Sequence, residues 1–268
     1  MRLRLGSALH LGLGLAMAFA FGGSSAYALE PVDVELVLSV DVSLSMDEDE
    51  QRLQRNGYAA AFRDPEVLAA IRNGRYRRIA LTYVEWGGID SARVVVPWMI
   101  IDGPDAADRF SRILDEAPLV RAARTSISNA LLFSGSLFEA NGYSGERRVI
   151  DVSGDGPNNQ GEQVTRARDA VVARGITING LPLISEPAQL TGAPDPRDLD
   201  IYYEDCVIGG LGAFLVVVRH PSEFAFAIRR KLILEIAAPR TQPRVIPAQF
   251  TFREQRTDCL VGEKRWAQ

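Results

Sequence analysis

The chain has 268 residues, with 30 lysine and arginine residues against 34 acidic ones and a formal net charge of −4. An acidic chain without a basic run argues against nucleic acid as a partner. Hydrophobic residues make up 47% of the sequence, which is enough to build one sizeable core and argues against disorder.

The N-terminus has the features of a secretory signal peptide. Arg2 and Arg4 precede an apolar stretch over residues 9–21, and small residues follow at Ala26-Tyr27-Ala28. This order predicts cleavage after Ala28, so residues 1–28 are excluded from the fold. No later stretch is both long and apolar enough to span a bilayer. We therefore expect a secreted or periplasmic protein without a membrane span.

The first predicted strand, Val34–Val40, is an almost uninterrupted apolar run, typical of a strand buried inside a parallel sheet. It is followed by Asp41, Ser43 and Ser45. Residues two apart in an extended chain point to the same side, so these three side chains can converge above the strand. One carboxylate and two hydroxyls suit a hard cation such as Mg²⁺ and do not suit zinc. The alternative is that Ser45 or Asp47 simply caps the next helix.

The remaining elements alternate between helices and strands. Helices are predicted over residues 47–62, 65–71, 102–116, 125–139, 160–174, 198–207 and 221–236. Strands are predicted over residues 79–84, 93–98, 147–152, 176–183 and 213–219. This alternation predicts an α/β fold with a doubly wound, mostly parallel central sheet, helices on both faces and one antiparallel hairpin strand. The domain is predicted to span residues 29–238, and the three prolines after it predict an extended C-terminal tail over residues 239–268.

Two further polar motifs lie at the ends of predicted elements. Asp155-Gly156 follows the strand over residues 147–152, and Thr125 opens a helix. Ligand sites in open α/β sheets lie at the carboxyl ends of the strands, so Asp41 and Asp155 are expected at one edge. Taken singly, Thr125 could be a helix cap and Asp155 part of an ordinary turn.

In this order the motifs resemble those of the von Willebrand factor A-domain family, whose mark is a metal-ion-dependent adhesion site. The family's Asp-x-Ser-x-Ser motif matches Asp41, Ser43 and Ser45, and its helix-opening threonine and Asp-Gly match Thr125 and Asp155. The resemblance covers nearly all of residues 32–238 and implies a Rossmann-like fold. It also implies that these five residues bind Mg²⁺, with Mn²⁺ or Ca²⁺ as alternatives. The bound ion would bridge to a carboxylate of a protein partner.

Some details separate this chain from the common family pattern. Ala123-Arg124 precedes Thr125 where the family usually has glycines, and Ser153-Gly154 replaces the more usual Leu-Thr. The Trp86-Gly87-Gly88 hairpin, the signal peptide and the cysteine-containing C-terminal part look like a bacterial secreted branch of the family with no assigned function.

Arg121 and Arg124 lie within four residues of Thr125. They are predicted to form a rim beside the metal position, where a guanidinium would attract and pair with a carboxylate. The alternative is that both are ordinary solvated loop arginines.

The last predicted helix carries Phe224, Ile228, Leu232 and Ile236 at a spacing of four residues. In the resembling family, a helix at this place shifts along the sheet when the metal loops rearrange, and Ser222–Ile236 corresponds to it. Static packing against the core is the alternative reason for such a stripe.

Two other classes of function remain open. Haloacid-dehalogenase-like phosphohydrolases also carry a nucleophilic aspartate after a strand, but they use a second aspartate as general acid where this chain has Ser43. A hydroxyl cannot serve as that acid near neutral pH, so we predict a binding module and not an enzyme. The third possibility is a scaffold component of an envelope complex in which metal is incidental.

Cys206 and Cys259 are the two cysteines of the chain. A secreted setting favours a disulfide between them, and two buried free thiols are the alternative. A bridge would tie back the C-terminal tail, and closing a loop of about 54 residues could contribute on the order of 4 kcal/mol.

Overall fold

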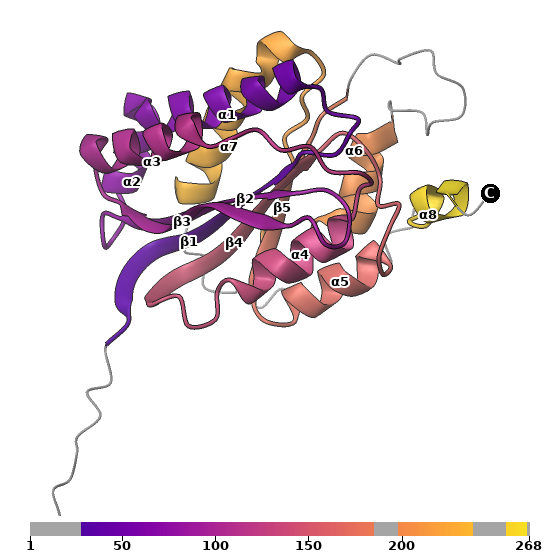
Figure 1. Cartoon of the computed structure of the whole chain (residues 1–268). Helices are drawn as coiled ribbons and strands as arrows, with labels where there is room; N and C mark the ends of the chain where they lie inside the picture. Colours follow the sequence, from indigo (N-terminus) through magenta and orange to yellow (C-terminus); the bar gives the residue numbers. More distant parts are fainter. Residues whose placement is uncertain (1–27, 185–197, 238–255, 267–268) are drawn as a thin grey trace, which may run out of the picture.

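The computed structural model describes residues 28–184, 198–237 and 256–266 (Figure 1). All but the last residue of the predicted signal peptide lies outside the described residues. Five strands form one sheet: β1 (Glu30–Asp41), β2 (Ile79–Trp86), β3 (Arg93–Ile101), β4 (Tyr143–Gly154) and β5 (Ile176–Pro182). Their spatial order is β3-β2-β1-β4-β5, and only the β2–β3 pair is antiparallel.

Helices cover both faces of this sheet (Figure 1). One face carries α1 (Glu48–Arg63), α2 (Pro65–Arg72), α3 (Pro104–Glu116) and α7 (Phe224–Ala237). The other carries α4 (Ile127–Ser136), α5 (Val164–Val172) and α6 (Leu199–Tyr202), which continues into a π-helical turn at Tyr203–Val207. The predicted α/β class, the mostly parallel sheet and the single hairpin strand are confirmed. Within the described residues, no helix is long and apolar enough to cross a membrane.

The central strand β1 is buried from Val32 to its end because both faces are covered, which explains its nearly continuous apolar sequence. Helix α1 then begins with a capping box: the Asp47 side chain accepts from the Glu50 amide, and the Glu50 side chain accepts from the Asp47 amide. The capping role considered for Ser45 therefore belongs to Asp47, and Ser45 remains in the turn before the helix.

The structure differs from the predicted strand over residues 213–219. This segment runs beside β5 but forms only isolated bridges, at Leu215 and Val218. The hydrogen bonds alternate as in a parallel ladder at Gly180, whose amide donates to Phe214 and whose carbonyl accepts from Val216. The next donor in the ladder would be the amide of Pro182, and proline has no N–H. The ladder is interrupted there for that reason.

Two further boundaries differ from prediction. Helix α4 begins at Ile127 and is capped by the Ser126 side chain, so Thr125 precedes the helix and does not cap it. At the C-terminus, a short helix, α8 (Val261–Trp266), occupies part of the predicted extended tail. Ser126 is the better cap of α4 because an N-cap side chain accepts from the amide three residues later, which here is that of Asn129.

Candidate metal-binding site

Four of the five predicted ligands form a continuous set of contacts at the carboxyl ends of β1 and β4. Asp41 is fully buried, and its Oδ1 accepts from the Ser43 amide at 2.7 Å. The Ser43 and Ser45 hydroxyl oxygens are 2.9 Å apart, and Ser45 Oγ donates to Asp155 Oδ1 at 2.8 Å. Side chains separated by 110 residues in sequence therefore meet at one edge of the sheet.

Thr125 lies on a third loop that is hydrogen-bonded to both of the others. Upstream of it, the Ala122 amide donates to the Val42 carbonyl at 3.0 Å. Thr125 itself donates its amide to Asn159 Oδ1, and its carbonyl accepts from the Asn159 amide, both at 2.9 Å. Thr125 is buried, and no direct hydrogen bond joins it to the other four predicted ligands in the described part of the chain.

The two arginines predicted for the rim have different surroundings. Arg121 donates to the carbonyls of Leu44 and Met46, at 2.7 and 3.1 Å, so its guanidinium holds the turn that carries Ser45. Arg124 is exposed, beside Thr125, and has a left-handed backbone with φ of 70°. The predicted contact with a partner's carboxylate stays a prediction for both.

The loop that follows Asp155 is held by residues that the sequence did not single out. The Asn158 amide donates to the Tyr202 hydroxyl at 3.1 Å, and Asn158 Oδ1 accepts from the Ser128 amide at 3.0 Å. Its Nδ2 donates to Glu263 Oε1 of α8 at 2.8 Å. Asn158 thereby joins the loop that follows Asp155 to α4, α6 and the C-terminal helix.

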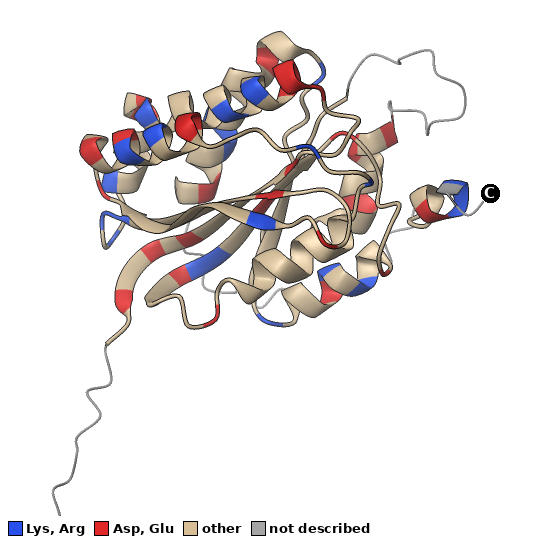
Figure 2. Cartoon of the chain, in the orientation of Figure 1, with Lys and Arg blue, Asp and Glu red and all other residues tan. Residues whose placement is uncertain are grey.

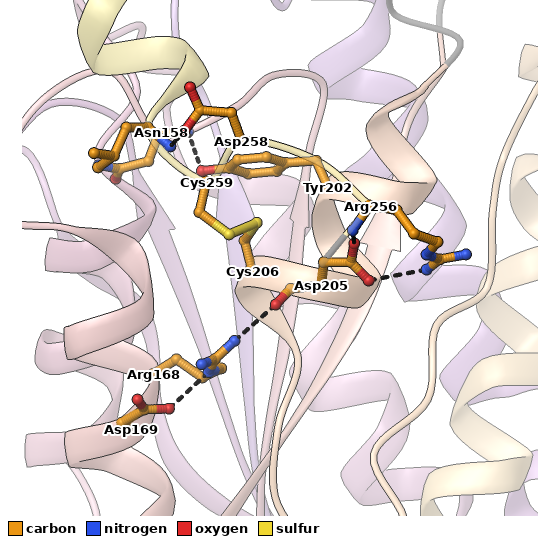
Figure 3. Close-up of a disulfide and its surroundings, with 10 residues drawn as sticks. Asn158, Arg168, Asp169, Tyr202, Asp205, Cys206, Arg256, Asp258 and Cys259 are labelled. Carbon is orange, nitrogen blue, oxygen red and sulfur yellow. Dashed lines mark hydrogen bonds and ion pairs between the residues drawn. A yellow bond between two sulfur atoms is a disulfide. The ribbon is translucent and has the colours of Figure 1, made fainter. Parts of the chain in front are cut away.

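The predicted disulfide between Cys206 and Cys259 is confirmed (Figure 3). It links the π-helical turn after α6 to the residues just before α8. Figure 3 shows Tyr202 pointing toward Asn158 above the bridge, with Arg256 paired to Asp205 beside it. The C-terminal helix is thus fixed against the loop that carries Asp155.

The electrostatics of the site favour an added cation. Burial and the charge of Asp155 raise the pKa of Asp41 well above its ordinary value, and burial raises the pKa of Asp155 to about 6. Within the described residues, neither carboxylate forms an ion pair with a lysine, arginine or histidine. Asp41 Oδ2 is buried without any hydrogen-bond partner there. A Cβ on Gly154 would lie 3.0 Å from this oxygen and 2.8 Å from the Tyr203 hydroxyl, so the absence of a side chain at Gly154 allows both groups to lie close to the strand.

The donor set is that of a hard divalent cation. Two carboxylates and three hydroxyls provide oxygen only, which suits Mg²⁺ and its relatives. Among the described residues, no three or more His, Cys, Asp or Glu side chains gather into a metal-binding group. A site here would therefore depend on the hydroxyls of Ser43, Ser45 and Thr125, and the unpartnered Asp41 oxygen fits such a role.

Solved structures with the same fold include several adhesion and matrix proteins. Proximal thread matrix protein 1 from the mussel byssus matches with a TM-score of 0.56 at 12% identity, over 78% of this chain and 49% of its own. The pilus adhesin SpaC from Lactobacillus rhamnosus GG matches with 0.54 at 11%, over 78% and 30%. A von Willebrand factor type A protein from Catenulispora acidiphila matches with 0.52 at 16%, over 77% and 43%. This chain thus spans less than half the length of each.

No protein of curated function matches the chain. A family model does match, over residues 31–240, and its description is "Protein of unknown function (DUF1194)". That match covers most of the chain, and the solved structures show the von Willebrand factor A-like fold for the same region. The chain therefore belongs to the DUF1194 family and has a von Willebrand factor A-like fold.

Proposed function

We propose that this protein is an extracytoplasmic docking module that binds a divalent cation and, through it, an acidic group of a protein partner. The cation would be held by Asp41, Ser43, Ser45, Thr125 and Asp155. The observation that carries the proposal is the buried Asp41 Oδ2, which has no hydrogen-bond partner in the described residues and lies near a second, half-buried carboxylate, that of Asp155.

A divalent cation at this position would balance the two carboxylates and leave a coordination position for water or an incoming carboxylate. Mg²⁺ is the expected ion, with Mn²⁺ and Ca²⁺ as alternatives. One structure of the mussel matrix protein is described with zinc in its metal-ion-dependent adhesion site (MIDAS) motif. Zn²⁺ therefore belongs in any titration of the present site.

Two features support a binding role outside the cytoplasm. The Cys206–Cys259 disulfide is of a kind that persists in oxidising compartments. At the site itself, the position that would need a general acid in a phosphohydrolase is occupied by Ser43, whose hydroxyl keeps its proton near neutral pH. We therefore propose a non-catalytic module.

Calorimetric titration with Mg²⁺, Mn²⁺, Ca²⁺ and Zn²⁺ tests the metal site. Asp41→Ala and Ser43→Ala should each reduce affinity by at least tenfold while the domain stays folded. Ser39→Ala is the matched control, because Ser39 is a buried serine of the same strand that contacts Ser134 and not the site. Undiminished affinity in Asp41→Ala would exclude the proposed ligand set.

Partner capture tests the docking role. The wild-type protein, immobilised in Mg²⁺, should retain a partner from an envelope extract and release it in EDTA. Asp41→Ala should not retain that partner. Capture that persists in EDTA and in the variant would instead support the scaffold alternative.

A further inference from the structure

A pocket of about 340 Å³ lies between α1, the end of β5 and the segment that leads into α7. Most of its wall is apolar, contributed by Met46, Leu53, Leu183, Ile184, Val218 and Phe224. None of the five proposed metal ligands lines it. It is therefore a separate cavity next to the site.

The walls of this pocket continue directly from the two loops that carry the metal ligands. Met46 follows Ser45 in the chain and lines the pocket. On the opposite side, the Leu183 amide donates to the Gly154 carbonyl at 2.9 Å, one residue before Asp155. A ligand bound between Ser45 and Asp155 would therefore have this pocket immediately beside it.

The size of the pocket suits one bulky side chain. A cavity of roughly 150 Å³ with apolar walls is enough to bind benzene. The volume here is about twice that, which admits a leucine, isoleucine, methionine or phenylalanine side chain together with its backbone. An apolar side chain placed there would remove the walls from water, which is the main source of affinity for such cavities.

The polar groups around the pocket fit a peptide. The polar side chains of the lining are those of Glu50, Gln54, Arg219 and His220, and together they supply both donors and acceptors. Arg219 is itself anchored, because its Nη2 lies 2.8 Å from Asp200 Oδ2. Peptide amides need both kinds of group, whereas a hydrocarbon chain would use neither.

We propose that the partner is bound through a short segment that pairs an acidic residue with a bulky apolar neighbour. The carboxylate reaches the cation, and the apolar side chain enters the pocket lined by Met46, Leu53 and Leu183. This inference rests on the proposed docking function and names the chemical class of its partner. The proposal predicts that the cation alone does not determine which partner segments bind.

A displayed library of random twelve-residue peptides tests both statements separately. Peptides retained in Mg²⁺ and eluted by EDTA should be enriched in Asp or Glu with Leu, Ile, Met or Phe within about four positions. Enrichment of acidic residues without apolar neighbours would overturn the pocket assignment and leave the docking function intact. Absence of any EDTA-eluted enrichment would overturn the docking function, and the present inference with it.

Variants of the pocket provide the second measurement, with the consensus peptide from the library as probe. Leu53→Trp fills the pocket from α1, and His220→Trp covers it from an exposed position that requires no change in the core. Each should weaken peptide binding at least tenfold without changing Mg²⁺ affinity. Leu132→Trp, on α4 across the sheet, is the matched control and should bind as wild type. Wild-type peptide affinity in both folded pocket variants would contradict the proposal.

Discussion

The described part of the chain contains two pairs of neighbouring acidic side chains, Asp151 with Glu235 and Asp41 with Asp155, and they differ in whether a basic side chain lies beside them. Asp151 of β4 and Glu235 of α7 both pair with Lys231, whose Nζ lies 2.7 Å from Asp151 Oδ1. All three are nearly inaccessible to solvent. Asp41 and Asp155, at the ends of β1 and β4, have no basic partner within the described residues. Figure 2 shows acidic positions within the strands as well as on the helices.

The difference follows from the cost of burying charge. A carboxylate removed from water needs a counter-ion or several hydrogen-bond donors, and its pKa rises if it lacks them. In the interior, where no ion can enter from solvent, Lys231 fills that need. At the strand ends, Ser45 is exposed and Asp155 is half-buried, so a cation from solution could reach them. The Lys231 cluster is therefore a structural ion cluster, whereas Asp41 and Asp155 belong to the proposed metal site.

Removing the interior cation should have the largest effect. Lys231→Met leaves Asp151 and Glu235 buried without a counter-charge, and we expect a loss of about 3–5 kcal/mol in the free energy of unfolding. Arg229→Met is the matched control on the same helix, because Arg229 pairs with Asp64 at the surface and should contribute less than about 1 kcal/mol. Urea denaturation of both variants gives the two values. Equal losses in the two variants would show that the buried ion pairs of Lys231 contribute no more to stability than the surface pair of Arg229.

These contacts also show what the sequence could and could not predict. The meeting of Asp41 and Ser43 was predictable because a period of two in an extended chain places them on one side. Ser45 reaches the same point from the turn that follows. The pairing of Lys231 with Asp151 was not predictable, because the two residues are 80 positions apart in the sequence. In addition, the pattern of the last helix pointed only to its apolar residues, spaced four apart from Phe224 to Ile236. That stripe is buried in the core. The same holds for Asn158, whose partners lie on elements that no local pattern connects.

The candidate metal site at Asp41 and Asp155 is also supported by the disulfide-linked helix α8, which, among the described residues, does not contact the cluster of Asp151, Lys231 and Glu235. Replacing both Cys206 and Cys259 by serine should lower the free energy of unfolding by about 2–4 kcal/mol. It should also weaken Mg²⁺ binding several-fold, because the Glu263 contact to Asn158 is no longer tethered. Denaturant melts and calorimetric titration measure the two effects.

Glu263→Ala separates the tether from the contact, since it keeps the disulfide. We expect this variant to lose Mg²⁺ affinity with little loss of stability. If the double serine variant binds Mg²⁺ with the same affinity as wild type, α8 does not position the loop that carries Asp155 and Asn158.

The interior cluster should also make stability depend on pH. Burial and the charge of Asp151 raise the pKa of Glu235 from 4.5 to about 7, against the opposing effect of Lys231. Between these values the folded protein binds more protons than the unfolded chain, so this contribution is present below about pH 4.5 and lost as pH rises through 7. At about 1.4 kcal/mol for each tenfold change in proton affinity, the contribution is at most roughly 3–4 kcal/mol.

Comparing wild type with Glu235→Gln isolates this contribution from those of other groups. Urea denaturation at several pH values between 4.5 and 8 should show wild type losing stability relative to the variant as pH rises. A constant difference between the two proteins across that range would mean that Glu235 does not titrate there.

The smallest expected effect is the most specific to the open site, because its sign depends on metal. Asp41→Asn removes the buried carboxyl group of the pair but keeps an oxygen to accept from the Ser43 amide. In EDTA, we therefore expect the variant to be more stable than wild type by about 1 kcal/mol. In Mg²⁺ at a hundredfold excess over its dissociation constant, wild type should gain about 2.7 kcal/mol and the variant almost nothing, so the order reverses. Thermal unfolding of both proteins in each buffer measures this crossing. A variant that is less stable than wild type in EDTA would mean that Asp41 is already stabilised by the chain, as Asp151 is by Lys231, and the distinction between the two carboxylate pairs would fail.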